Sequence, residues 1–215
     1  LTGFPGRSTI PLADIVVGRG EAATFGFGTN SGVFLQASAP VDPATLPVMA
    51  EMSIHRRSNA MLIDLDHPAA APVPILADTK AAGTALRPAN LITLLPYPGH
   101  PLLPTTRYAA VLFDGARDTG GNRLAPAPII GLLDGAAPVG VDPATWGQLQ
   151  QDRNDVVGAV RDRTLWHPTE LVAFTAFTTQ DTTGEMDALA DAVAALPAPQ
   201  VLSRTPDTAP CPAGG

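Results

Sequence analysis

PLLPTTRYAAVLFDGARDTGGNRLAP, residues 101–126, is the stretch from which the fold is predicted. It opens with the pattern L-x-P-x-T-x-Y, formed by Leu102, Pro104, Thr106 and Tyr108. Strand-forming residues follow, so 106–114 is expected to be a strand with two faces: Tyr108, Ala110 and Leu112 on one, and Ala109, Val111 and Phe113 on the other. The segment then turns, because Asp118 can accept backbone hydrogen bonds and Gly120 and Gly121 tolerate positive φ.

This pattern resembles the tyrosine corner of immunoglobulin-like (Ig-like) and fibronectin-type sandwiches. There, a tyrosine at the start of a strand makes a hydroxyl hydrogen bond to upstream backbone. The resemblance implies that Tyr108 is buried and bonded in this way. The longer pattern Y-x-x-x-L-x-x-G-x-x-D-x-x-G-N also resembles bacterial Ig-like domains of surface and secreted proteins, in which a closing strand ending in F-x-F-T-T or a close variant follows.

ELVAFTAFTTQD, residues 170–181, is the expected closing strand, because it holds an unbroken series of β-formers. We expect 171–178 to pair with 106–113. VAFTAF is too apolar for an open sheet edge, so Phe174 and Phe177 are expected to be buried. Their burial would stabilise the fold by about 1.5 to 3 kcal/mol each.

Four further strands are expected, at 32–39, 59–66, 72–76 and 90–96. In NAMLIDLD, the alternation predicts Met61, Ile63 and Leu65 on one face and Leu62 and Asp64 on the other. Pro and Gly together account for 23 + 20 = 43 residues, which favours short strands and turns over long helices.

Two helices interrupt this pattern. In 143–163 the covered face is expected to hold Trp146, Leu149, Val156, Val157 and Val160, while Gln148, Asp152, Asp155 and Asp162 face water. In 183–197 the shared face holds Met186, Leu189, Ala190 and Val193, and Pro197 ends the helix. The sequence VDPAT occurs at 41–45 and 141–145, where Asp followed by Pro suits a helix start.

The expected fold is mainly β: an Ig-like β-sandwich at 1–182 with a helical insertion at about 135–168 before the last strand, then a C-terminal helix and Pro-rich tail at 183–215. This layout resembles the N-terminal, SbsA-type sandwich region of secreted bacterial α/β-hydrolases of the virulence-factor lipase and esterase type. In that family a hydrolase domain with a G-x-S-x-G motif follows the sandwich.

Composition excludes several classes of protein. The net charge is −7 and basic residues are scattered, which excludes a nucleic-acid footprint. No apolar run reaches the ~18 residues of a membrane-spanning helix, so we expect a soluble chain. The sequence begins at Leu1 without a basic or apolar leader region, and we therefore expect that a leader was removed or the chain trimmed. Cys211 is the single cysteine, so no internal disulfide is possible.

Catalytic and metal sites find little support. No G-x-S-x-G is present, and Ser31 in GTNSG is misplaced for a nucleophile, so no catalytic residue and no cofactor are expected. The four histidines, His55, His67, His100 and His167, lack zinc-site spacing. Asp114, Asp118 and Asn122 offer oxygen ligands that suit calcium, but a turn held by Asp and Gly explains them better.

The expected function is therefore a non-catalytic, extracytoplasmic Ig-like accessory or interaction domain, associated with a secreted hydrolase or a cell-surface assembly. Its partner would be another protein or a downstream domain. Two alternatives stay open: the chain is the N-terminal portion of an active esterase or lipase, or it is a free-standing structural subunit that uses exposed strand edges. The residues expected to matter are structural: Leu102, Pro104, Thr106, Tyr108, Phe174 and Phe177.

Overall fold

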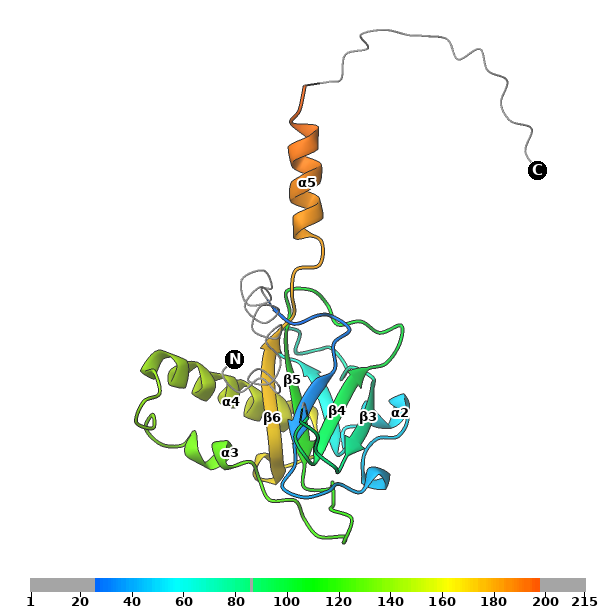
Figure 1. The fold of residues 1–215 in the computed structure, drawn as a ribbon, viewed down its shortest axis with the longest axis vertical. Coiled ribbons are helices and arrows are strands. Elements are labelled where there is room, and N and C mark those ends of the chain that lie inside the picture. The colour runs from blue at the N-terminus through cyan, green and yellow to red at the C-terminus, as the bar shows by residue number, and fades with distance from the viewer. Residues whose placement is uncertain (1–25, 86, 198–215) are drawn as a thin grey trace, which may run out of the picture. The chain divides into compact units, whose positions relative to one another are not determined.

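The computed structural model describes residues 26–85 and 87–197 (Figure 1). The described chain forms a mixed, β-rich fold with two three-stranded antiparallel sheets. The chain divides into two compact units, Leu1–Asp181 and Thr182–Gly215. Both sheets belong to the first unit.

The first sheet has the strand order β1–β4–β3, with β1 at Val33–Gln36, β4 at Leu91–Pro96 and β3 at Ile75–Lys80. The second sheet has the order β2–β5–β6, with β2 at Ala60–Asp64, β5 at Arg107–Phe113 and β6 at Leu171–Thr178. The predicted pairing of 171–178 with 106–113 is confirmed, since Tyr108 lies opposite Phe177 and Val111 opposite Phe174.

The second sheet is buried on both faces. Tyr108, Ala110 and Leu112 of β5 face the first sheet and share a core with Leu35, Ile75 and Leu94. Ala109, Val111 and Phe113 face the opposite way and pack with Val156 and Val160 of the helix α4, Pro143–Arg163. The two faces predicted from alternation are therefore both present, and β5 is the central strand between two cores.

The predicted helix 143–163 coincides with α4. It begins where the sequence predicts, because the Asp142 carboxylate accepts a hydrogen bond from the Thr145 N–H at 2.8 Å. In the other VDPAT copy, Asp42 accepts from the Ala44 N–H at 3.0 Å and starts the 3₁₀ helix η1, Pro43–Thr45.

The helix face differs in part from its prediction. Trp146 is buried, but Leu149 is 38% exposed, so its expected burial is wrong. Asp152 and Asp155 are half-buried rather than facing water, because Arg107 of β5 donates to their carboxylates at 3.0 and 2.8 Å. Helical periodicity depends only on which positions of the helix are apolar. It cannot predict that an arginine of the neighbouring sheet pairs with aspartates of the helix.

The strand expected at 72–76 begins later, at Ile75. Pro72 and Pro74 have no N–H to donate to a ladder, so only Val73 between them makes an isolated bridge, to Leu62 of β2. Shorter elements complete the first unit: α2 at Ala50–Ser53, α3 at Pro128–Leu132 and the 3₁₀ helix η2 at Pro168–Glu170.

The position of β6 corrects an expectation from the sequence. β6 is an edge strand, and Phe174 and Phe177 are half-buried rather than enclosed in a sheet interior. The apolar character of the strand reflects contact on its two faces, with Val172 and Ala173 in one core and Leu171 in the other. It does not reflect hydrogen bonding on both sides.

The second unit contains the helix α5, Gly184–Ala194, which is shorter than the expected 183–197. All of its large apolar side chains are exposed, from 56% for Leu189 to 66% for Met186. The Pro-rich tail from 198 onward and Cys211 lie outside the described residues.

Candidate functional site: the open side between β1 and β6

The tyrosine corner lies beside the C-terminal end of β6, where Tyr108 is opposite Phe177. Tyr108 is 2% exposed, and its hydroxyl accepts a hydrogen bond from the Leu103 N–H at 3.0 Å. Burial raises the pKa of the Tyr108 phenol. The Tyr108 ring stacks on Phe177 of β6, with ring centroids 6.1 Å apart. The burial and the backbone bond are those that the sequence pattern implies.

A buried threonine joins this corner to the end of β6. The Thr179 hydroxyl accepts from the Thr106 N–H at 2.9 Å and donates to the Leu103 carbonyl at 2.6 Å. Of the other corner residues, Leu102 and Thr106 are buried, whereas Pro104 is exposed. The corner therefore fixes where β6 ends relative to β5.

The four edge strands of the two sheets are protected unequally. On one side, β3 carries the Asp78–Lys80 ion pair at 2.7 Å. On the outer side of β2, the Leu62 carbonyl accepts a hydrogen bond from the Val73 N–H. On the other side, β1 (VFLQ) and β6 (LVAFTAFT) contain no charged residue and no proline. Charges and prolines are the usual devices that stop an edge strand from pairing with another chain. The β1 and β6 edges lack them.

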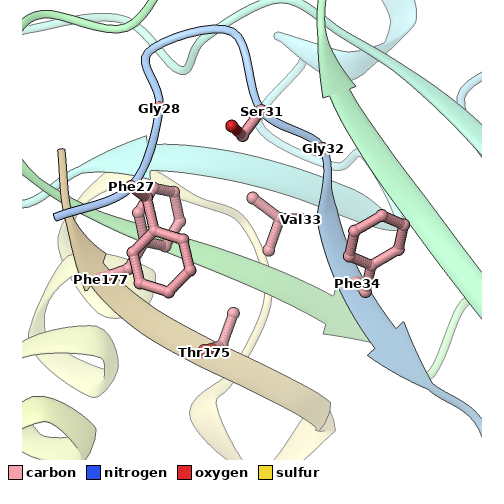
Figure 2. A pocket seen from close by; sticks show the side chains of 8 residues that line it. All are labelled: Phe27, Gly28, Ser31, Gly32, Val33, Phe34, Thr175 and Phe177. Carbon is pink, nitrogen blue, oxygen red and sulfur yellow. The ribbon is translucent and has the colours of Figure 1, made fainter. Parts of the chain in front are cut away.

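A groove lies between these two unprotected edges (Figure 2). Its volume is about 250 Å³, and it is lined by Phe27, Gly28, Ser31, Gly32, Val33, Phe34, Thr175 and Phe177. Phe27 packs edge-on against Phe177 with ring centroids 5.3 Å apart, and Figure 2 shows Phe34 across from them on the β1 side. Phe27 is 59% exposed and Phe34 is 60% exposed. We call this feature the β1/β6 groove.

The groove offers apolar contact and backbone hydrogen bonds, but no catalytic set. None of its eight lining residues is His, Asp, Glu, Lys or Arg. Ser31 does lie at the groove, but in a turn where its N–H donates to the Gly28 carbonyl at 3.0 Å, and no lining residue can act as its base. All four histidines are exposed. His67 contacts the Asp64 carboxylate through Nδ1 at 2.8 Å, while His167 caps η2.

The calcium candidates take part in a hydrogen-bonded turn. One Asp118 carboxylate oxygen accepts from the N–H groups of Gly120 at 2.8 Å and Asn122 at 2.7 Å. The hydrogen bonds from Asn122, side chain first and backbone next, hold the pKa of Asp118 below its ordinary value. Asp114 instead forms an ion pair with Arg123. Within residues 26–85 and 87–197, no three His, Cys, Asp or Glu side chains gather as a metal site. These hydrogen bonds form the turn, held by Asp and Gly, that the sequence favours over a calcium site.

A second, polar depression lies where α4 crosses the second sheet. Its volume is about 450 Å³, and Arg107, Asp155 and Arg163 are among its lining residues. These charges are already paired within the fold: Arg107 bonds Asp155, which raises the arginine pKa, and Arg163 donates to the Asp64 and His67 carbonyls. We therefore assign these residues to holding α4 in place.

The sequence did not single out Phe27 and Phe34 as site residues. Both stand in segments that read as strand or turn, TFGFG and GVFLQ, and an apolar residue there is as compatible with a core as with a surface. Neither segment contains a sequence pattern that indicates an exposed phenylalanine. Their exposure becomes visible only in the structure, where both line the β1/β6 groove.

Comparisons with known proteins give no family. No protein-family model matches the chain, and no curated protein matches it. A comparison with solved structures finds the crystal structure of the S-layer protein rSbsC(31-844), at 17% sequence identity and a TM-score of 0.28. The match covers 52% of this chain and 14% of that chain. A TM-score this low does not indicate a shared fold. Among the described residues, no helix has the length and apolar character needed to cross a bilayer.

Proposed function

We propose that this chain is a non-catalytic, extracytoplasmic interaction domain that binds a protein partner through the β1/β6 groove. The observation that carries the proposal is the pair of exposed phenylalanines, Phe27 and Phe34, which flank an uncharged groove between two unprotected strand edges. Aromatic side chains around an uncharged depression are typical of the centre of protein interfaces.

We propose an Ig-like sandwich as the fold class within this β-rich arrangement. The support is the tyrosine corner, in which Tyr108 receives the Leu103 N–H, together with a core that joins side chains of both sheets. The helical insertion before β6 fits the same proposal, since α4 packs on the outer face of the second sheet.

The proposed partner context is a secreted hydrolase or a cell-surface assembly. This rests on the resemblance of the segments around 101–126 and 170–181 to the sandwich region of secreted lipases and esterases. In that context the domain would position or present a partner domain. The alternatives are that the chain is the N-terminal portion of an active esterase, or a free-standing subunit. A G-x-S-x-G motif encoded beyond Gly215 would favour the first of these alternatives.

Site-specific photo-crosslinking tests the interaction. A benzoylphenylalanine is placed at Phe34 and, as a matched control, at Leu165, which is equally exposed at 57% but does not line the groove. Both chains are expressed in the organism that encodes them. We expect a discrete crosslinked protein from position 34 that is absent from position 165. Identical products from both positions, or none from position 34, contradict the proposal.

A further inference from the structure

We infer that the free edge of β6 is a slot for one added strand, about five residues long, supplied by an extended segment of a partner protein. This rests on the proposed function, because it specifies how the β1/β6 groove would bind its partner.

The hydrogen-bonding pattern of β6 defines the slot. Residues of an edge strand direct their backbone N–H and C=O alternately toward and away from the neighbouring strand. The Val172 and Thr178 carbonyls point away from β5, because they accept from the Ala127 N–H at 2.7 Å and the Phe27 N–H at 2.9 Å. By alternation, the N–H and C=O of Phe174 and Ala176 point the same way. Among the described residues, none makes a hydrogen bond to these four groups.

The hydrogen bonds at Val172 and Thr178 limit the length of a segment that can pair with β6. The unpaired stretch between Val172 and Thr178 matches the length of about five extended residues, or roughly 17 Å. A second copy of this chain cannot pair its β6 along the full length, because the segments at Ala127 and Phe27 occupy both ends. Five residues also bury far less than the roughly 1,200 Å² of a stable globular interface, so the occupant is a peptide segment of a larger partner.

The side chains around the slot define the chemistry of the occupant. Those of Thr175 and Phe177 point to the groove, whereas Phe174 faces the core beneath α4. Neither β6 nor the groove lining carries a charge, so a charged residue of the partner would lose hydration without gaining a counter-ion. The matching segment is therefore extended and uncharged, with small or β-branched residues at alternate positions toward Phe27 and Phe34.

A defined peptide tests this slot. The probe is fluorescein-labelled Lys-Thr-Val-Thr-Val-Thr-Lys, whose five central residues match the free length, and binding to the full chain is followed by anisotropy. Two N-methylated versions carry methyl groups on the central three threonines or on the two valines. Only one set of N–H groups can face β6, so we expect one version to lose binding and the other to keep it. The identity of the inactive version shows which alternate residues of the peptide direct their N–H groups toward β6.

A matched pair of protein variants completes the test. Ala176→Pro removes an outward N–H from β6. Ala77→Pro is placed on the outer side of a protected edge strand, β3, where the neighbouring outward N–H of Ile75 bonds the Ser53 hydroxyl at 2.9 Å. We expect Ala176→Pro to weaken peptide binding at least about tenfold and Ala77→Pro to leave it unchanged.

Thermal unfolding verifies that each variant is folded. If Ala176→Pro does not fold, the N-methylated peptides test the slot on the unmodified chain. No peptide binding at millimolar concentration, equal losses from both N-methylated versions, or equal effects of the two prolines would overturn the inference. The crosslink from position 34 would still stand in that case, so failure of the slot is distinguishable from failure of the proposed function.

Discussion

Replacing Tyr108 with Phe should destabilise the fold by about 1 to 2 kcal/mol. The ring is 2% exposed and keeps its stacking on Phe177, so the change removes the hydroxyl and little else. What is lost is the acceptor for the Leu103 N–H, 3.0 Å away, in a partly buried hydrogen bond. For a domain of this length the loss corresponds to a melting temperature lower by about 2 to 8 °C.

Urea unfolding followed by tryptophan fluorescence measures this loss, and an unchanged slope with urea would show that only stability has changed. The sequence supplies a matched control, because Tyr97 is the other of its two tyrosines and is 41% exposed. Tyr97→Phe should change stability by less than about 0.5 kcal/mol. If the two variants lose the same free energy of unfolding, the hydrogen bond of the Tyr108 hydroxyl does not stabilise the fold.

Three further predictions concern pH, truncation and catalysis. Because the folded-state pKa of Asp118 is lowered, its stabilising contribution is complete above the ordinary aspartate pKa of about 4 and is lost as the pH falls through the folded value. Asp118→Asn should therefore lose less stability than the parent chain between about pH 4 and 2 in acid unfolding monitored by circular dichroism. Truncation after residue 168 removes β6 and should unfold or aggregate the chain, while truncation at about residue 200 should leave the melting temperature unchanged; a monomeric, equally stable 168 variant would contradict the role of β6. The purified chain should not hydrolyse p-nitrophenyl esters, and turnover abolished by a single Ser→Ala change would show this to be wrong.

Local chemistry was the most predictable part of the fold. Asp142 followed by Pro143 marks the start of α4, and the alternation from Tyr108 to Phe113 separates the residues of the two cores. Both are decided by neighbours within a few residues along the chain, through a side-chain cap in one case and the period of a strand in the other. The tyrosine pattern also predicted a specific contact, because it fixes the acceptor and its donor on one short segment.

Sheet order and exposure were less predictable. LVAFTAFT reads as a strand enclosed on all sides, yet burial on two faces gives the same sequence signature as burial in a sheet interior. The exposure of Phe27 and Phe34 depends on how far β1 lies from β6, which no local pattern encodes. The β1/β6 groove therefore arises only from the packing of the two sheets. The Arg107 pairing that half-buries Asp155 has the same origin.

The late position of β6 in the sequence has a consequence for how the protein is made. β5 is the centre of its sheet, but residues 114–170 must leave the ribosome before β6 can pair with it. At ordinary translation rates this takes about 3 to 11 s. During that interval AAVLF of β5 presents an unpaired apolar edge, so the nascent chain depends on fast translation of the insert or on chaperone cover. Slow codons within 114–170 should therefore lower the yield of folded protein without changing a single residue.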